Sequence, residues 1–240
     1  MAVYCEEPSP ASIARWVECS WSMESATPVA AHAVPPDGCV DIVYDRRRGL
    51  SAVGAMSVQQ RFEFPQGAYV AGVRFRPGMA RPFLGLLPSE LTDRSAPLED
   101  LWRRRAGELH RRLDDAKSIR DAMRILLGSL PAPRNAPSPV QQAIEAVAAT
   151  HGAADLESAA RSANLSPRHF RRRCLEECGL TPKRLCRVLR FRRACRLAGD
   201  SARPDWSAIA YEAQYFDQAH LIRDFREFTG LTPMAVFSNT

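Results

Sequence analysis

The sequence predicts an α+β N-terminal domain with a small antiparallel sheet, followed by an all-α C-terminal domain with two helix-turn-helix motifs joined by a long helix. Three observations favour this fold class. Candidate strands occur only in the first third of the chain, four prolines fall within residues 131–139, and the second part contains an internal repeat of helical segments. We therefore divide the chain into a domain over 1–130, a Pro-rich linker over 131–139 and a domain over 140–240.

The composition is that of an ordinary soluble globular protein. The chain has 240 residues, of which 45% are hydrophobic and 25% charged, so disordered, collagenous and coiled-coil classes are excluded. No run approaches the ~18 consecutive apolar residues that indicate a membrane span. The first residues lack the basic and apolar regions of a secretory signal. We therefore expect a cytoplasmic protein with no membrane partner.

The N-terminal part alternates apolar and polar residues in short runs. A segment over 12–20 is compatible with a short helix or a strand, and turn residues follow at 35–38. Strands are then predicted over 40–44, 50–58, 61–64 and 69–76, the last with Tyr69, Ala71, Val73 and Phe75 on one face. Helices are predicted over 79–87 with an interruption at Pro82, over 97–113, and after a cap at Ser118. Strands followed by helices indicate an α+β domain.

The linker and the helices after it are marked by proline and by capping residues. Proline lacks an N–H and restricts the residue before it, so no helix or central strand is expected to cross 131–139. Helices are predicted over 139–150, 156–163, 167–178, 182–198, 206–214 and 218–229, with a last turn from Thr232. Their first residues follow the caps Ser166, Thr181, Asp205 and Asp217, and glycines end two of them at 179 and 230.

The basic charge is concentrated in one block. Residues 161–203 contain thirteen Lys or Arg and three acids, a net charge of +10, whereas residues 204–240 carry −3. Such a block is typical of proteins that bind nucleic acid, although a solvated basic helix face is an equal alternative on charge alone. Twelve of the thirteen cations are arginines, whose planar fork suits phosphate and guanine edges.

An internal repeat fixes the architecture of the second part. Residues 165–182 align with residues 216–233 at an offset of 51, and seven of eighteen positions are identical, including both Gly-Leu-Thr-Pro segments. The preceding helices align at Ala160 and Ala210, an offset of 50, so the second copy has one extra residue in its turn. Each copy is a short helix, a tight connection and a second helix, which is a helix-turn-helix. The helix between the copies spans roughly 27 Å at ~1.5 Å per residue, enough to hold two recognition helices about one DNA turn apart.

Several short segments of the repeat carry a resemblance to a known family. They are Asn164-Leu-Ser-Pro-Arg-His-Phe, Gly179-Leu-Thr-Pro, Ile209-Ala, Phe216-Asp-Gln-Ala-His-Leu and Gly230-Leu-Thr-Pro. On these segments, residues 156–237 resemble the C-terminal DNA-binding domain of the AraC/XylS family of bacterial transcription regulators. The sequence departs from the family at Gln214, where a glycine is usual, and at Cys174 and Leu185, which are often aromatic.

The first 130 residues do not have the strand pattern of an arabinose-binding cupin. Segments 36–43, 72–78 and 98–102 are similar to a different N-terminal domain that occurs in some AraC-type regulators, and this similarity implies no known ligand. The resemblance as a whole implies a regulator bound to double-stranded DNA. RNA polymerase, a small-molecule effector and a second copy of the chain are possible further partners.

The resemblance also suggests which side chains touch DNA. Base contacts are expected from Arg168, Arg171 and Arg172 in the first motif and from Gln218, Ala219, Ile222 and Arg223 in the second, with contact to phosphates alone as the alternative. The histidines His169 and His220 occupy equivalent repeat positions, which indicates a shared structural or phosphate-binding role. Further phosphate contacts are expected at the start of the long helix, from Lys183, Arg184, Arg187 and Arg190.

Three alternatives concern the rest of the chain. No metal-binding histidine spacing, nucleophile elbow or phosphate-binding loop is present, so we expect neither an enzyme nor a cofactor. A methyl-accepting DNA-repair regulator would need a zinc-cysteine site, and Cys5, Cys19 and Cys39 lack its spacing; all seven cysteines are expected to be reduced. The N-terminal part is either a ligand sensor or only a dimerisation or protein-interaction module. A ligand pocket would be lined by Trp16, Trp21, Tyr44, Tyr69, Arg74 and Arg76, which are equally compatible with core aromatics and surface charges.

Overall fold

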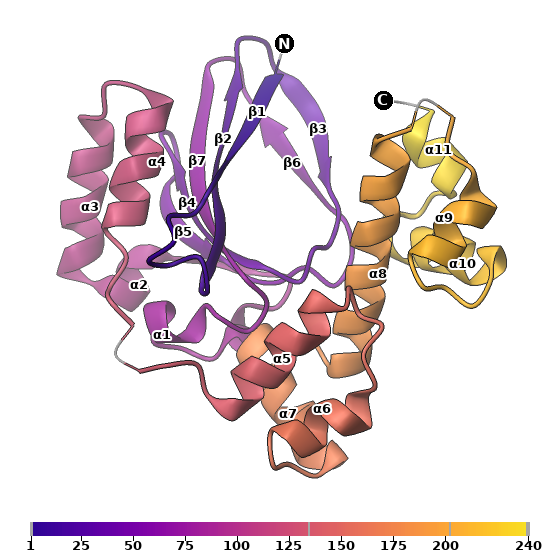
Figure 1. The fold of residues 1–240 in the computed structure, drawn as a ribbon. Helices are drawn as coiled ribbons and strands as arrows, with labels where there is room; N and C mark the ends of the chain where they lie inside the picture. Colours follow the sequence, from indigo (N-terminus) through magenta and orange to yellow (C-terminus); the bar gives the residue numbers. More distant parts are fainter. Residues whose placement is uncertain (1, 134, 202, 239–240) are drawn as a thin grey trace.

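The computed structural model describes residues 2–133, 135–201 and 203–238. The N-terminal unit is built on a six-stranded antiparallel sheet with the strand order β1-β2-β7-β4-β5-β8 and a separate pair, β3-β6 (Figure 1). The sheet strands are β1 (Ala2–Pro8), β2 (Val17–Ser25), β7 (Ala68–Phe75), β4 (Val40–Asp45), β5 (Gly49–Val53) and β8 (Ser95–Pro97). The pair consists of β3 (Val29–Val34) and β6 (Gln60–Phe64).

Helices cover one face of this sheet and close its core. They are α1 (Arg81–Leu84), α2 (Leu98–Trp102), α3 (Arg104–Asp114) and α4 (Ile119–Gly128), with a 3-10 turn η1 (Pro88–Leu91). Helix α4 packs on β7 and β2. The predicted inward face of β7 is confirmed, since Ala71, Val73 and Phe75 are fully buried in the core, and Val73 pairs with Ile42 of β4. Burial of these apolar side chains is the main stabilising contribution of the unit.

The N-terminal strands and helices differ from the prediction in four places. Strands β1, β3 and β8 were not predicted; β1 is largely exposed, β3 is alanine-rich and β8 has three residues. The segment 12–16 is a turn that leads into β2. Strand β5 ends before Gly54, where a Cβ would lie 1.8 Å from the Leu91 carbonyl oxygen. The helix predicted over 97–113 is two helices, because Arg103 adopts a φ of 47° between them.

The C-terminal unit is helical throughout, as predicted. Described residues of 131–138 form no helix or strand, and α5 begins at Pro139 with Ser138 as its cap. The caps Ser166, Thr181, Asp205, Asp217 and Thr232 each accept a hydrogen bond from the first turn of a helix, which satisfies an otherwise unpaired N–H. The helices are α5 (Pro139–Ala149), α6 (Leu156–Ser162), α7 (Pro167–Cys178), α8 (Pro182–Gly199), α9 (Trp206–Glu212), α10 (Gln218–Thr229) and α11 (Pro233–Phe237).

The repeat forms two helix-turn-helix motifs, α6–α7 and α9–α10, connected by α8 (Figure 1). Ala160 and Ala210 are buried where the helices of each motif meet. The second turn is one residue longer than the first. Asn164 and Gln214 occupy equivalent positions with φ of 55° and 64°, so a glutamine adopts the left-handed conformation that glycine takes without strain.

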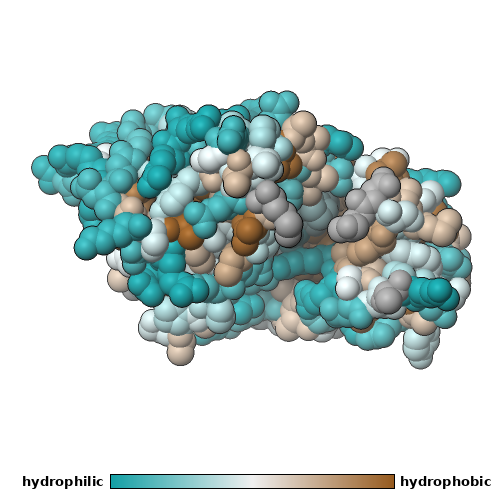
Figure 2. Space-filling view, turned by 90° about the horizontal axis from the view of Figure 1, so that it is seen from above, coloured by the Kyte–Doolittle hydropathy of each residue, from teal (hydrophilic) through white to brown (hydrophobic). Residues whose placement is uncertain are grey.

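The two units pack against each other along α8. Arg192 of α8 pairs with Glu18 of β2. Gly38 lies against Leu185 of α8, so a Cβ at position 38 would be 2.9 Å from that side chain. The buried apolar residues of both units form one continuous cluster. Viewed from above, the surface is mostly hydrophilic and a recess lies between the N-terminal unit and α9–α11 (Figure 2).

Candidate nucleic-acid interface

The first motif presents three arginines on one side of α7. Arg168, Arg171 and Arg172 are exposed, whereas Phe170 and Cys174 are buried on the opposite side. Among the residues that the structure describes, Arg168 and Arg171 have no ion-pair partner, and Arg172 has only a 3.9 Å contact with Glu176. Because the buried pair anchors the helix, the three guanidinium groups project into solvent from its first two turns. This face can donate hydrogen bonds to guanine edges or phosphates.

The second motif presents a less basic face. On α10, Gln218, Ala219 and Arg223 are exposed, and Ile222 is half-buried and packs against the core. The side chain of Gln218 accepts a 3.1 Å hydrogen bond from the Ser207 hydroxyl of α9. Arg223 is the one cationic residue type among these four positions, so this face contributes less charge toward DNA than α7 does.

Three arginines predicted to contact phosphates have internal partners. Arg187 donates to the buried Asp224 carboxylate at 2.6 Å and also pairs with Glu227. Arg184 pairs with Glu227, donates to the carbonyl of Ser57 and lies 4.4 Å from the Phe228 ring centroid.

Arg190 donates to the carbonyl of Gly152 and lies beside the Tyr215 ring. Hydrogen bonds from Arg187 and then Arg184 lower the pKa of Glu227 to about 2, so Glu227 stays ionised at neutral pH. In this structure these arginines hold α10 and α5–α6 against α8.

The remaining predicted phosphate ligands differ in their surroundings. Lys183 is exposed, and it lines with Arg171 a groove of about 200 Å³ between α6, α7 and the start of α8. His169 is exposed. Its repeat partner His220 packs edge-on against the Tyr215 ring at 5.2 Å. Equivalent repeat positions therefore have different environments in the two motifs.

Two exposed aromatic residues and one exposed arginine of the second motif were not among the predicted site residues. Phe216, next to the cap of α10, is 94% exposed, and Tyr211 of α9 is 86% exposed. Arg226 is exposed one turn beyond Ile222 on α10. The position of Arg226 is predictable from the sequence, because it lies one helical turn after Ile222. The exposure of the two aromatic side chains depends on the packing of neighbouring residues.

The candidate pocket residues of the N-terminal unit do not line one pocket. Tyr44 and Tyr69 stack edge-to-face at 6.5 Å. Arg74 pairs with Glu6, Asp37 and Asp41 on the other side of the sheet, where the Trp21 ring covers Gly72. Arg76 donates to the Ala14 carbonyl, and Trp16 faces α1 and the linker. Alternation along β2 and β7 sends these side chains to different faces, so the structure favours the alternative of core aromatics and charged side chains over a shared ligand pocket.

The N-terminal unit touches the C-terminal ends of both recognition helices. The Thr92 hydroxyl donates to the carbonyl of Gly179, which caps α7, at 2.8 Å. The Gln59 N–H donates to the carbonyl of Phe228, in the last turn of α10, at 2.7 Å. Both helices are thus held from the same unit at the ends opposite to their capped first turns.

Within the described ranges, no three His, Cys, Asp or Glu side chains are grouped to hold a metal, so Cys5, Cys19 and Cys39 do not form such a set there. None of the helices in these ranges is long and apolar enough to cross a membrane.

Two family models match separate parts of the chain. Residues 159–239 match a family described as a helix-turn-helix domain, and residues 6–97 match a domain of unknown function, DUF6597. A comparison with curated proteins gave no match. Among solved structures, the chain is similar to ToxT from Vibrio cholerae, with a TM-score of 0.44, 9% identity and coverage of 99% of this chain and 97% of that one. The structure of wild-type ToxT from Vibrio cholerae bound to an unsaturated fatty acid gives a TM-score of 0.43, 10% identity and coverage of 90% of this chain and 92% of that one.

Proposed function

We propose that this chain is an AraC-type DNA-binding transcription regulator that reads two adjacent major-groove segments of one duplex. The match of residues 159–239 to a helix-turn-helix domain supports the proposal. In this proposal α7 and α10 are the two recognition helices. The N-terminal unit controls them through a small ligand.

The observation that carries this proposal is the exposed arginine face of α7. Arg168, Arg171 and Arg172 project from the first two turns of a helix whose other side is anchored by Phe170 and Cys174. Side chains at the start of a recognition helix reach base edges in the major groove. We assign base contacts to these three arginines and phosphate contacts to His169 and Lys183.

In this proposal the second motif also contacts bases, but its contacting positions carry less positive charge than those of the first motif. We assign these contacts to Gln218, Ala219 and Arg223, with the methyl groups of the half-buried Ile222 at the edge of the interface. Gln218 suits adenine and Ala219 suits a thymine methyl group. The two boxes of the DNA site should therefore differ in composition, with a G-rich box under α7. We do not extend the phosphate role to Arg184, Arg187 and Arg190, because their guanidinium groups have partners within the chain.

Control by the N-terminal unit is supported by the two hydrogen bonds at the ends of the recognition helices. A ligand that shifts the N-terminal unit would change the positions of the Gly179 and Phe228 carbonyls, and with them the spacing of α7 and α10. The two binding equilibria are linked. If the ligand changes the affinity of the protein for DNA by some factor, DNA changes the affinity of the protein for the ligand by the same factor.

The test is binding of the purified full chain to labelled DNA from upstream of its own and neighbouring genes. Arg172→Ala and Arg223→Ala should each weaken binding to the true site by roughly 1–3 kcal/mol and relax base preference at one position. Arg104→Ala is the matched control, because the Arg104 side chain is 93% exposed on α3 of the N-terminal unit. Equal losses on specific and random DNA for both arginines would reject base reading.

A further inference from the structure

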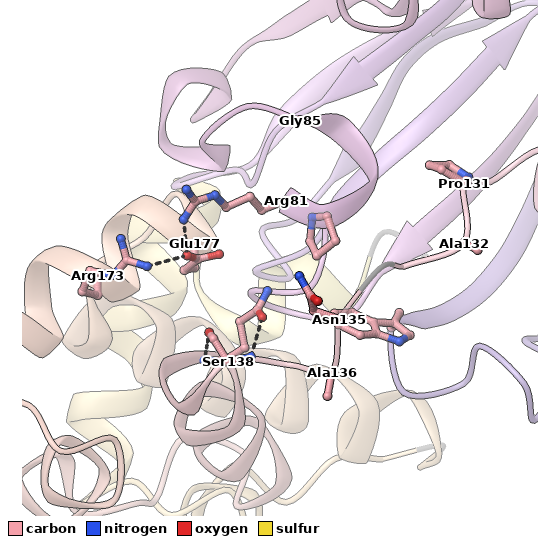
Figure 3. Close-up of a pocket in the computed structure, with 12 residues that line it drawn as sticks. Arg81, Gly85, Pro131, Ala132, Asn135, Ala136, Ser138, Arg173 and Glu177 are labelled. Atoms are coloured by element: carbon pink, nitrogen blue, oxygen red, sulfur yellow. Dashed lines mark hydrogen bonds and ion pairs between the residues drawn. The ribbon is translucent and has the colours of Figure 1, made fainter.

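A pocket of about 590 Å³ lies where the N-terminal unit, the linker and the first recognition helix meet (Figure 3). Its volume is within the about 300–1,000 Å³ of typical small-ligand sites. Trp16, Pro82 and Pro131 provide apolar surface, and Arg81, Arg173 and Glu177 provide charge. Glu177 and Arg173 belong to α7, so the pocket is bounded by the helix that carries the DNA-contacting arginines.

The charged residues form an ion-pair group with one unsatisfied atom. Arg81 donates to Oε1 of Glu177 at 2.6 Å across the interface between the units, and Arg173 donates to the same oxygen at 3.1 Å. The Glu177 side chain is 3% exposed, and within the part of the chain that the structure describes its Oε2 has no hydrogen-bond partner. Figure 3 shows this carboxylate between the two guanidinium groups. A buried carboxylate oxygen without a donor is costly, so a donor supplied from the pocket would be favourable.

Arg81 offers the complementary group. Its side chain is 40% exposed, and within the described residues its guanidinium bonds only to Glu177, through Nη1. The other N–H groups can therefore bind an acceptor in the pocket. Arg173 also pairs with Glu176 at 2.7 Å, and Glu176 has a longer 3.9 Å contact with the exposed Arg172. The ion pairs of 3.1 Å or less therefore join two arginines, Arg81 and Arg173, with two glutamates, Glu176 and Glu177, and the charges of these four side chains balance.

We propose that this pocket binds an α-amino acid with an apolar side chain. The ligand carboxylate accepts from Arg81, the ligand ammonium donates to Oε2 of Glu177, and the side chain packs against Trp16, Pro82 and Pro131. A zwitterion leaves the charge of the group balanced, whereas a simple carboxylate or a simple amine would add one unbalanced charge beside the buried Glu177 carboxylate. The assignment of a regulatory effect to this site rests on the proposed function, but binding itself does not.

The experiment is calorimetric titration of the full chain, without DNA, with three matched probes. L-Phenylalanine carries both charged groups, 3-phenylpropionic acid lacks the ammonium, and 2-phenylethylamine lacks the carboxylate. We expect L-phenylalanine to bind at least ~10-fold more tightly than either, because each analogue lacks one hydrogen bond between charged groups.

The variants locate the site. Glu177→Gln should remove the preference for L-phenylalanine over 3-phenylpropionic acid, and Arg81→Gln should remove its preference over 2-phenylethylamine. Arg104→Gln, an exposed control, should bind all three as the unmodified chain does. Ala132→Trp fills the pocket from an exposed linker position without touching the ion pairs, so it should block binding even if the charge variants unfold.

Equal binding of the three probes, or L-phenylalanine binding that survives Ala132→Trp, would overturn the proposal. So would the absence of binding by L-phenylalanine, L-leucine and L-tryptophan at ~10 mM. Binding of L-phenylalanine at this pocket with unchanged DNA affinity would support the site and reject only its role in DNA control.

Discussion

Insertion of base pairs between the two proposed boxes of the DNA site tests whether α7 and α10 are held rigidly relative to each other. Helix α8 has 18 residues and is therefore about 27 Å long. Its packing against α10 is fixed by the Arg187–Asp224 pair and by Phe191, whose ring lies 4.8 Å from that of Phe225. Since one DNA turn is ~34 Å, this arrangement fits boxes about one turn apart on the same side of the duplex.

Inserting ~5 base pairs turns the second box to the opposite side of the duplex, where α10 cannot reach it. The loss should equal at least one good base contact, about 1–3 kcal/mol, which is about 5- to 150-fold in Kd. Inserting ~10 base pairs returns the second box to the same side of the duplex but moves it a full turn further from the first box. The affinity of a single protein molecule for this duplex should therefore stay low.

Fluorescence anisotropy with labelled duplexes measures all three affinities, and a duplex with a scrambled second box is the control. That control should bind as weakly as the two insertions. Binding of one molecule to the ~10-base-pair insertion as tightly as to the original duplex would refute the rigid arrangement.

Arg187→Ala leaves the buried Asp224 carboxylate without its arginine, so the free energy of unfolding in urea should fall by about 3 kcal/mol. The salt slope of DNA binding should stay unchanged, and a smaller slope would show that Arg187 contacts a phosphate. Gln214→Gly relieves a φ of 64° and should raise stability by about 1 kcal/mol, whereas a lower Tm would contradict that reasoning. The pKa of Glu227 is lowered from 4.5 to about 2, so its contribution to stability is present above about pH 4.5 and is lost as the pH falls toward 2. The Tm difference between the unmodified chain and Glu227→Gln should therefore stay constant from about pH 7 to 5.5 and shrink below about pH 4.5, and a difference that grows with acid would be inconsistent. Light proteolysis should cut within 131–139 and release a C-terminal fragment that stays folded by circular dichroism and binds DNA; an unfolded fragment would show that the boundary is misplaced.

The helical unit was predictable because its signals are local. Capping residues such as Ser166 and Thr181 act on N–H groups within the next turn, and Gly179 ends α7 by its own backbone conformation. The repeat then placed two such helix pairs on either side of α8. The N-terminal sheet was less predictable, since β1 and β3 have few buried residues and form only because a partner strand pairs with them.

The candidate site divides in the same way. The exposure of Arg168, Arg171 and Arg172 follows from helical spacing opposite Phe170 and Cys174, so the sequence is sufficient to place them on one face. The partners of Arg187 are 37 and 40 residues further along the chain, and no local pattern identifies them. The basic block therefore contained both solvent-facing and internally paired arginines that charge alone did not separate.

By itself, the sequence determined the two-part organisation, the duplicated helix-turn-helix motifs and the side of α7 that faces solvent. These features depend on interactions within a few residues, and such interactions are encoded in spacing, capping and the repeat. Only the tertiary structure decided that the N-terminal unit holds the Gly179 and Phe228 carbonyls and that Arg81 meets Glu177 across a pocket. Arg81 and Glu177 are 96 residues apart, and their contact depends on how two separately patterned units pack, which is set by long-range shape and charge complementarity.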